Sequence, residues 1–500
     1  MTGQRDTATL RVTIRTAASA GIGAGHVART LAVATELHRM GADVRWTCDA
    51  DTVSCLRDRG VHADRICVME AAATAGHAGG RQAADADQQR DAMKTLALGH
   101  PDADWVLVDT YGLGLTWQRT VRAGGARIAA FDDLVDRPID ADLVINAAAS
   151  PSQYARLAPH ARVLSGLRYA IVGDPSRPPA AGPGTLLVAF GAADPDNLTE
   201  ATLRALATRA THAPRSVPQT VVQLGGTAPH RERVAGLVAA LSWVTFAPAG
   251  STTPGSPSLA IGAAGVGLLE RMHAGVPSVM VVVAPNQRAL AEVAANTGAA
   301  IVATTPEAAC ETALALLADP AALNRMSIAG MAAVDGRGAA RVARAMNRTT
   351  EVDLRRATMN DAAALHRWRN APAVRAVSHV TDDIPWDSHM RWLEASLARH
   401  DRHVLIAERR GRALGTIRFD VEGAVATVSI AVEPALQGTG LGPAILDAGE
   451  RWLLEHDLRV HRLRAEIRPG NEASARAFLA AGYLGGPETY ERAVGHRSET

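Results

Sequence analysis

A glycine-rich turn followed by a histidine stands near the start of the sequence. Three glycines within residues 21–25 precede His26, and they lie between an apolar run typical of a strand (10–14) and a run that predicts a helix (27–40). Glycine lets the backbone turn sharply and lets a ligand come close. A helix begins with free N–H groups at the positive end of its dipole, so the imidazole of His26 could meet an anionic substrate there. A tight turn with a surface histidine explains the same residues equally well, because a glycine-rich turn alone is a weak motif.

A second turn of the same kind lies in the middle of the chain. The run 259–262 predicts a strand, and the glycines and alanines of residues 262–265 then open a predicted helix that includes Glu270. Free amides and the helix dipole make this turn a second candidate anion site. Glu270 lies about 1.5 turns into the helix, where its carboxylate could bind the hydroxyl groups of a ribose.

Several other polar residues follow the ends of apolar runs. Tyr111, Asp194, Asn286 and Gln287 each come a few residues after a predicted strand. Any one of them is more often a cap or turn residue than a ligand. Together they are harder to dismiss, because ligands of open parallel sheets bind beside the carboxyl ends of the strands.

The order of the predicted elements indicates three domains. From residue 10 to about 350, near-continuous apolar strands alternate with helices, which predicts parallel sheets covered on both faces. Two such series meet near residue 165, so we expect an α/β fold with two doubly wound Rossmann-like domains, 1–165 and 166–350, facing each other across a cleft. From residue 351 short strands follow one another closely, which predicts a separate α+β domain, 351–500.

The charge and composition limit the kinds of binding partner and the cellular compartment that we expect. The formal net charge of +1 argues against a nucleic acid or a membrane surface as the main partner. The four cysteines form no C-x-x-C pair and have no histidine at metal-ligand spacing, so we expect free thiols in a reducing cytoplasm. The sequence shows no signal peptide and no apolar run long enough to span a bilayer, which also favours a cytoplasmic location. It leaves the oligomeric state open.

The last domain carries its own phosphate-binding pattern. Residues 437–442 have the sequence Q-G-T-G-L-G and lie between a predicted strand (425–432) and a predicted helix. The residues expected to bind the cofactor are Gln437, Gly438, Gly440 and Gly442. The backbone amides of such a loop can surround a pyrophosphate group. Taken alone, the pattern is a moderate signal.

The first two domains resemble a known family of sugar-nucleotide enzymes. The motifs that carry the resemblance, in chain order, are GAGHVAR, VDTYGLG, FDD, FGAADPDNLT, AIGAAGVGLLERMHAGVPSVMVVVAPNQ and VDGRGAARV. As a set they resemble the UDP-2,4-diacetamido-2,4,6-trideoxy-β-L-altropyranose hydrolases of pseudaminic acid biosynthesis. That family has the two-domain fold of type B glycosyltransferases, passes the sugar to water instead of an acceptor, and needs no metal. The resemblance covers about residues 10–345.

This resemblance assigns roles to individual residues. His26 would activate the water that attacks the anomeric carbon, and UDP would leave with inversion. Tyr111 and Asn286 match residues of the sugar site, and Glu270 matches the uridine diphosphate site. The residues expected to contact the UDP-sugar in the hydrolase are Gly25, Tyr111, Asp194, Gly265, Glu270, Asn286 and Gln287.

The last domain resembles the GNAT acetyltransferases. The glycine loop is followed by NEASARAFLAAGY, which begins at Asn471. The resemblance implies that the loop holds the pyrophosphate of acetyl-CoA and that Asn471 lies beside the pantetheine arm. WRNAPAVR, followed by His389 and Trp392, resembles the branch that acetylates amino sugars on nucleotides, so His389 is expected to contact that substrate.

The proton chemistry of this domain departs from the family. Many members have a tyrosine seven residues after the asparagine, where this chain has Phe478. Tyr483 matches a position that is usually a structural aromatic. Glu433, at the end of a predicted strand, is a candidate catalytic base, although a solvated strand-end carboxylate explains it equally well.

The sequence therefore predicts a bifunctional cytoplasmic enzyme. The acetyltransferase would acetylate the 4-amino group of a UDP-sugar, and the hydrolase would release the diacetamido sugar, without a metal ion. Two alternatives stay open: a glycosyltransferase that uses the same cleft and a UDP-sugar donor, and a sugar-nucleotide-binding protein with an inactive acetyltransferase domain.

Overall fold

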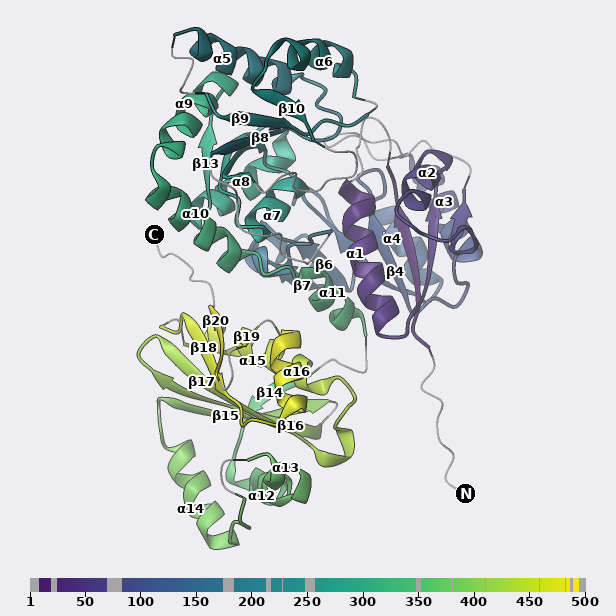
Figure 1. The fold of residues 1–500 in the computed structure, drawn as a ribbon. Coiled ribbons are helices and arrows are strands. Elements are labelled where there is room, and N and C mark those ends of the chain that lie inside the picture. Colours follow the sequence, from purple (N-terminus) through teal and green to yellow (C-terminus); the bar gives the residue numbers. More distant parts are fainter. Residues whose placement is uncertain are drawn as a thin grey trace. The chain divides into compact units, whose positions relative to one another are not determined.

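The chain forms two compact units, Met1–Met346 and Asn347–Thr500, in the computed structural model that we describe (Figure 1). The first unit contains two parallel sheets, and the second contains one mixed sheet. The structure describes residues 9–18, 25–69, 83–173, 184–212, 217–226, 228–247, 257–347, 352–378, 381–409, 411–457, 459–481, 483–485 and 489–493.

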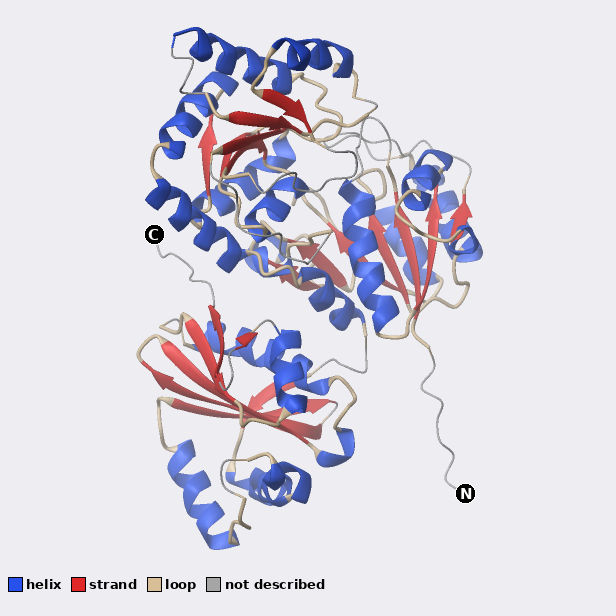
Figure 2. Cartoon of the chain, in the orientation of Figure 1, coloured by secondary structure: helices blue, strands red, loops and turns tan. Residues whose placement is uncertain are grey.

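The first sheet has seven parallel strands in the order β3-β2-β1-β4-β5-β6-β7. The order reverses between β1 and β4, and the carboxyl ends of strands at such a switch point form the usual ligand crevice. Helices cover both faces, because successive side chains of these strands enter two separate cores (Figure 2). The elements are β1 (Arg11–Thr16), α1 (Gly25–Arg39), β2 (Asp43–Cys48), α2 (Ala50–Arg57), β3 (Ile66–Val68), α3 (Asp85–Leu98), β4 (Trp105–Asp109), α4 (Leu115–Ala123), β5 (Arg127–Phe131), β6 (Leu143–Asn146) and β7 (Arg162–Ser165).

The second sheet repeats this plan with six parallel strands in the order β10-β9-β8-β11-β12-β13. Its switch point lies between β8 and β11. The two sheets confirm the expected α/β class with doubly wound, Rossmann-like organisation. The elements are β8 (Thr185–Ala189), α5 (Leu198–His212), β9 (Gln219–Val222), α6 (Arg231–Ala240), β10 (Val244–Phe246), β11 (Leu259–Ala263), α7 (Val266–His273), β12 (Ser278–Val281), α8 (Arg288–Asn296), β13 (Ala300–Ala303), α9 (Pro306–Leu317) and α10 (Pro320–Ala333).

A last helix of the first unit, α11 (Gly338–Met346), returns to the first sheet. Val342 and Met346 are fully buried in the same core as Val27 and Leu37 of α1. The helix begins at a glycine because a Cβ atom at Gly338 would lie 2.1 Å from the carbonyl oxygen of Ala170. Residues that follow the second sheet in sequence therefore complete the core of the first.

The second unit is an α+β sheet in the order β14-β15-β16-β17-β18-β20-β19. Its neighbouring strands are antiparallel except for β17 and β18, which are parallel. Helix α15 packs on the sheet through Ile445 and Leu453, which are almost completely buried. The elements are β14 (Asp353–Arg356), α12 (Ala362–Asn370), α13 (Pro372–Ala376), α14 (Trp386–Leu397), β15 (Arg402–Arg409), β16 (Arg412–Glu422), β17 (Val425–Val432), α15 (Leu441–His456), β18 (Arg462–Glu466), α16 (Glu472–Ala481), β19 (Leu484–Gly485) and β20 (Thr489–Ala493).

The two parallel strands of this sheet separate along their length. β17 pairs with β18 only over Val425–Thr427, whereas it stays paired with β16 as far as Val432. The second half of β17 therefore has an open side. Polar backbone groups on that side are available to a ligand.

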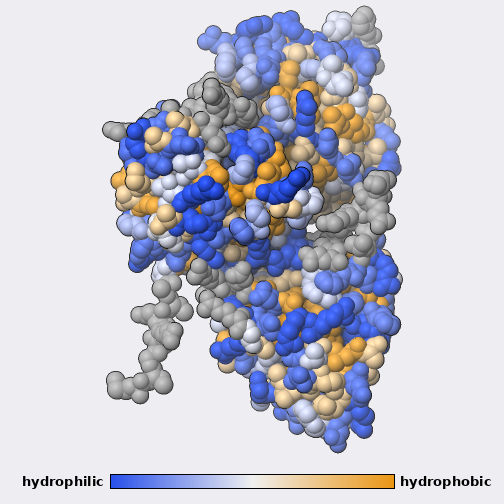
Figure 3. All heavy atoms as spheres, turned by 180° about the vertical axis from the view of Figure 1, so that it is seen from behind, coloured by the Kyte–Doolittle hydropathy of each residue, from blue (hydrophilic) through white to orange (hydrophobic). Residues whose placement is uncertain are grey.

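In the view of Figure 3, hydrophobic residues occur in groups among hydrophilic ones. Among the described residues, no helix is both long enough and apolar enough to cross a membrane.

Candidate active sites

The predicted catalytic histidine is paired with a buried aspartate. His26 is the second residue of α1, and its Nδ1 atom lies 2.5 Å from Oδ1 of Asp109, the last residue of β4. The two residues are 7% and 1% exposed. Nη2 of Arg29 lies farther from the same nitrogen, at 3.3 Å, so the carboxylate is its hydrogen-bond partner and the ring proton sits on Nδ1. This tautomer leaves the lone pair of Nε2 free to accept a proton.

Asp109 stays ionised in this buried position. Burial by itself would raise its pKa, but Arg29 and His26 outweigh that effect and hold the pKa of this carboxyl well below its ordinary value. An ionised partner keeps the imidazole oriented and stabilises the imidazolium that forms when Nε2 takes a proton.

Arg29 connects this pair to a second aspartate. Its Nε and Nη2 atoms donate to the two carboxylate oxygens of Asp109, both at 2.6 Å. Its Nη1 and Nη2 atoms donate to the two oxygens of Asp133, both at 2.9 Å. The guanidinium carbon also lies over the Phe131 ring, 4.6 Å from its centre. This is a cation–π contact, in which the negative face of the ring attracts the cation.

Tyr111 and Asn286 complete the group. The Tyr111 hydroxyl donates to Oδ2 of Asp133 at 2.8 Å, and its ring meets the His26 ring edge-on at 4.9 Å between centroids. Asn286 lies in a short 3₁₀ turn after β12 and donates from Nδ2 to the Tyr111 oxygen at 3.2 Å. Oδ1 of Asn286 is buried and has no hydrogen-bond partner among the described residues. It is therefore an acceptor that a substrate N–H or O–H group could satisfy.

Two neighbouring aspartates have different roles here. Asp133 binds Arg29 and Tyr111, whereas Asp132 accepts from the Tyr154 hydroxyl at 2.7 Å and from two backbone N–H groups. Burial raises the pKa of Asp132, although those hydrogen bonds oppose it. Asp132 holds the loop, and only Asp133 faces the site.

The N-termini of two helices meet beside this group. Gly25 is the first residue of α1, and a Cβ atom there would lie 3.5 Å from Cγ2 of Val266, the first residue of α7. Gly265 caps α7, and Oε1 of Gln287 accepts from the Ala264 amide at 3.3 Å, which fixes this turn. The positive ends of two helix dipoles therefore converge, as an anion site requires. Residues 21–24 of the predicted first turn lie outside the described residues.

The other two carboxylates predicted for the hydrolase lie in different surroundings. Glu270 lies on α7, and its carboxylate lies beside the backbone of Gly173. If Gly173 carried a Cβ atom, that atom would be 3.3 Å from Oε1 of Glu270. Asp194 accepts from the backbone amides of Leu198 and Thr199 at 3.0 and 2.9 Å, so it caps the start of α5. The structure therefore shows a capping role for Asp194, and its predicted contact with substrate stays a prediction.

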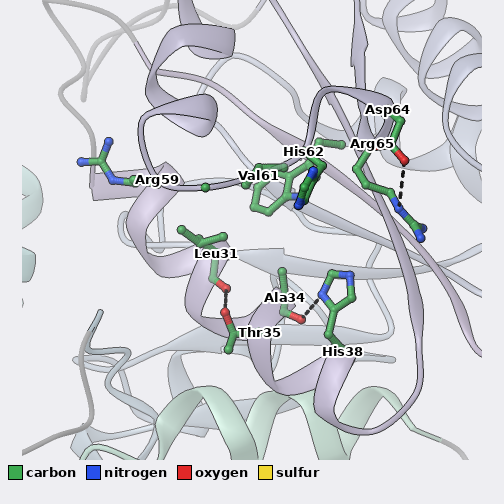
Figure 4. Close-up of a pocket in the computed structure, with 11 residues that line it drawn as sticks. Leu31, Ala34, Thr35, His38, Arg59, Val61, His62, Asp64 and Arg65 are labelled. Atoms are coloured by element: carbon green, nitrogen blue, oxygen red, sulfur yellow. Dashed lines mark hydrogen bonds and ion pairs between the residues drawn. The ribbon is translucent and has the colours of Figure 1, made fainter.

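A cavity of about 590 Å³ lies elsewhere on the first unit (Figure 4). It is lined by the later turns of α1, including Thr35 and His38, and by the segment before β3, including His62 and Arg65. The residues predicted for the two sites are not among its lining residues. It is a surface hollow at the far end of α1 from His26.

In the second unit, the predicted glycine loop opens α15. Gly438 and Gly440 have φ values of 79° and 80°, a left-handed conformation that other residues rarely adopt, and Gly440 caps the helix. A Cβ atom at Gly442 would lie 3.1 Å from Cβ of Ala477, so this glycine lets α15 approach α16. Two glycines thus shape the loop, and the third serves packing.

The known proteins that are similar to this chain fall into two groups, one for each unit. Residues 351–484 match the family model described as an acetyltransferase (GNAT) domain. The second unit is a GNAT acetyltransferase domain. The aminoglycoside acetyltransferase AAC(6')-Ib, solved with paromomycin and acetyl-CoA, is 19% identical, with 29% of this chain and 93% of that chain covered and a TM-score of 0.26.

A second solved GNAT acetyltransferase, from Streptococcus pneumoniae, is 16% identical over 29% of this chain and 100% of that chain, with a TM-score of 0.26. The first unit is similar to MurG from Acinetobacter baumannii, at 19% identity over 67% of this chain and 99% of that chain, with a TM-score of 0.47. None of the curated proteins matches the chain significantly.

Two of the residues predicted for the GNAT domain are used by the fold itself. Oδ1 of Asn471 accepts from the Ser474 amide at 3.1 Å, so its side chain caps α16. His389 is 3% exposed, and its Nε2–H group donates to the Ala362 carbonyl at 3.1 Å. Burial and the neighbouring His366 lower the pKa of His389. Its ring therefore joins α14 to α12 as a neutral imidazole, and its predicted contact with substrate stays a prediction.

Glu433 lies at the end of β17, and Gln437 follows the short 3₁₀ turn after it. Glu433 follows the last residue of β17, and its Oε2 atom lies 3.7 Å from Nη2 of Arg412. That oxygen is buried without a hydrogen-bond partner in the described part of the chain. A buried carboxylate oxygen of this kind can accept a proton, which keeps Glu433 as the candidate base.

Tyr483 lies in the core of the GNAT domain. It is 2% exposed, and its ring packs edge-on against Phe478 at 4.8 Å between centroids. Because the ring belongs to the core, we expect Tyr483→Phe to change kcat for acetyl transfer by less than about tenfold. The measurement is steady-state kinetics with an amino-sugar nucleotide. A fall of about a hundredfold in kcat at unchanged KM, in a folded variant, would instead show that Tyr483 acts in the transition state.

No metal ligand set accompanies these sites: within the described ranges, His, Cys, Asp and Glu side chains form no group of three or more that could hold a metal ion.

Proposed function

We propose that this protein is a bifunctional enzyme of nonulosonate biosynthesis. Its first unit would hydrolyse UDP-2,4-diacetamido-2,4,6-trideoxy-β-L-altropyranose to the free sugar and UDP. Its GNAT domain would acetylate the 4-amino group of the UDP-sugar precursor with acetyl-CoA. The observation that carries the hydrolase assignment is the His26–Asp109 pair, which lies beside Tyr111 from the loop after β4, itself bonded to Asn286 from the turn after β12.

The His26–Asp109 pair supports a general-base role in hydrolysis. Nε2 of His26 takes a proton from water while the water oxygen forms a bond to the anomeric carbon. The bond from that carbon to the β-phosphate oxygen breaks, and its electron pair leaves with UDP. Attack from the face opposite the leaving group inverts the configuration. Asp109 then stabilises the imidazolium, which returns its proton to solvent.

The convergence of α1 and α7 at Gly25 and Gly265 supports binding of the diphosphate. Helix N-termini supply N–H donors and a positive field where the leaving group develops negative charge. Gln287 fixes the α7 turn, and Glu270 on the same helix is the candidate partner of the ribose hydroxyls. Asn286, whose Oδ1 has no hydrogen-bond partner in the described part of the chain, and Tyr111 would contact the sugar.

Removal of divalent cations with EDTA is expected to leave the hydrolysis rate unchanged, because backbone amides and helix dipoles neutralise the diphosphate. The measurement compares UDP release in EDTA with release in added Mg²⁺ or Mn²⁺. A strict requirement for either cation would contradict this account of leaving-group stabilisation.

The open side of β17 and the loop that starts α15 support acetyl transfer in the GNAT domain. The nitrogen of the sugar amine would form a bond to the carbonyl carbon of the acetyl group of acetyl-CoA. The bond from that carbon to sulfur would break, and CoA would leave as a thiolate that takes up a proton from water. The amides of Gln437–Gly442 would hold its pyrophosphate, and Glu433 would take the proton that the amine loses. Asn471 would lie beside the pantetheine arm, as the family resemblance implies.

Mass spectrometry of the products tests both activities together. We expect the full chain, supplied with the UDP-4-amino sugar and acetyl-CoA, to yield CoA, UDP and the free diacetamido sugar. Transfer of the sugar to an added acceptor in preference to water would make the first unit a glycosyltransferase. Binding without any product would make the protein a sugar-nucleotide-binding protein.

A further inference from the structure

Arg29 occupies the centre of the hydrolase site without a role in the chemistry described above. It lies one helical turn after His26 on α1, and its side chain is 10% exposed. Four hydrogen bonds join its guanidinium to Asp109 and Asp133, two to each carboxylate. A buried guanidinium that is saturated by two carboxylates is a fixed geometric element.

We propose that Arg29 is a positioning residue that sets the spacing between the His26 imidazole and the Tyr111 hydroxyl, a role that rests on the hydrolysis proposed above. Each of the two carboxylates shares one oxygen between Arg29 and a second residue of the site. Oδ1 of Asp109 accepts from both Arg29 and His26, and Oδ2 of Asp133 accepts from both Arg29 and Tyr111. Nη2 of Arg29 donates to both shared oxygens, so the base and the sugar-facing hydroxyl are joined through one nitrogen of a planar group.

The fork of the guanidinium is what this arrangement needs. An arginine presents its N–H groups in one plane and can bind two carboxylates side by side, whereas a lysine ammonium is a compact point charge. Lysine at this position would keep the positive charge, but it could not hold Asp109 and Asp133 in one plane. Charge and geometry can therefore be separated by substitution.

The charges around His26 make a second consequence testable. The groups that face its ring are Asp109 from β4, Arg29 from its own helix, and Tyr111 and Asp133 from the loops after β4 and β5. Burial would raise the pKa of Asp133, but Arg29 outweighs it and keeps this pKa low. Without Arg29, the two carboxylates would repel each other with no cation between them, so we expect the groups that they hold, His26 and Tyr111, to move apart.

The experiment compares Arg29→Gln and Arg29→Lys with the wild type and with Arg39→Gln, which removes an exposed arginine from the same helix. NMR spectra follow the ring protons of His26, whose signals are identified by their absence in His26→Asn. Arg29→Gln removes both the positive charge and the fork between the two carboxylates. We expect it to lower kcat for hydrolysis by at least about 10²-fold and to remove the ring-current shift that the edge-on Tyr111 ring imposes on His26.

Arg29→Lys tests the geometry. The positive charge is kept in this variant, so the lost fork is the change that it tests. We expect kcat for hydrolysis to fall about 10²-fold at an unchanged KM, because small misplacements of reacting groups have effects of that size. The His26 ring protons should also lose the ring-current shift that the edge-on Tyr111 ring imposes.

The outcomes separate this role from the proposed activity. If the wild type hydrolyses no UDP-sugar, the proposed function fails, while the ring-current shifts of His26 still decide the role of Arg29. Ring-current shifts in Arg29→Gln equal to those in Arg39→Gln would show that the two carboxylates need no cation between them, and would overturn the charge argument. Wild-type ring shifts in Arg29→Lys would overturn the positioning argument.

Discussion

Replacement of His26 by asparagine is expected to lower kcat for UDP-sugar hydrolysis by about 10²–10⁴-fold, the usual contribution of a general base. Asparagine can still donate a hydrogen bond to Asp109, so the buried carboxylate keeps a partner and the fold should persist. UDP should bind as in the wild type, because the amides and the helix dipole that we assign to it are unchanged. The measurements are initial rates of UDP release and calorimetric titration with UDP.

A matched control uses the other end of the same helix. His38 is exposed, and its ring N–H donates to the Ala34 carbonyl at 2.8 Å, one turn earlier (Figure 4). His38→Asn should therefore hydrolyse the substrate at the wild-type rate. Near-normal hydrolysis by His26→Asn would remove His26 from the mechanism, and loss of activity in both variants would indicate a folding defect of α1.

Replacement of Gly440 by valine is expected to abolish acetyl transfer and to weaken acetyl-CoA binding by more than about 100-fold. Gly440 has a φ of 80°, which a β-branched residue adopts only with strain, and its side chain would fill the space that the pyrophosphate needs. Hydrolysis by the first unit should be unaffected. Acetyl-CoA binding by calorimetry and UDP release by the same preparation measure the two effects separately.

Gly423 provides the control for backbone strain. It also has a positive φ, 60°, and it lies in the turn between β16 and β17, away from the glycine loop. Gly423→Val should lower the stability of the GNAT domain and still bind acetyl-CoA. Equal loss of binding in both variants would show that strain, and not occupation of the pyrophosphate space, explains the Gly440 result.

The fold could be predicted largely because its strands are continuous apolar runs. β4 is buried along its whole length, as a strand covered on both faces of a parallel sheet must be, and its sequence WVLVD shows this directly. The return of α11 to the first core could not be predicted. An amphipathic helix shows that it needs a partner surface, but its sequence does not identify which sheet provides that surface.

The candidate hydrolase site was partly visible in the sequence. His26, Tyr111 and Asn286 were predicted from strand ends and motifs, and the structure brings all three together. Asp109 and Arg29 were missed as their partners, although both lie within the quoted motifs. The available signals were an aspartate two residues before Tyr111 and an arginine three residues after His26, which places it on the same helix face.

Residues whose side chains cap helices were harder to interpret. Asp194 and Asn471 each precede a helix, and both a ligand contact and an N-cap need an oxygen at that place. His389 had a motif in its favour, but its Nε2–H group is used by a backbone carbonyl of α12. Sequence patterns do not resolve such cases, because the competing partner is a main-chain group that carries no residue signature.

The central claim is that water attacks the anomeric carbon of a UDP-sugar in the first unit. Hydrolysis in ¹⁸O-labelled water, with rapid mass spectrometry of UDP and sugar, tests it directly. Cleavage of the bond between the anomeric carbon and oxygen predicts UDP without the label and one ¹⁸O atom in the newly formed sugar. Label in UDP would mean attack at phosphorus, and unlabelled UDP with the sugar attached to another acceptor would mean glycosyl transfer; either result would contradict the account.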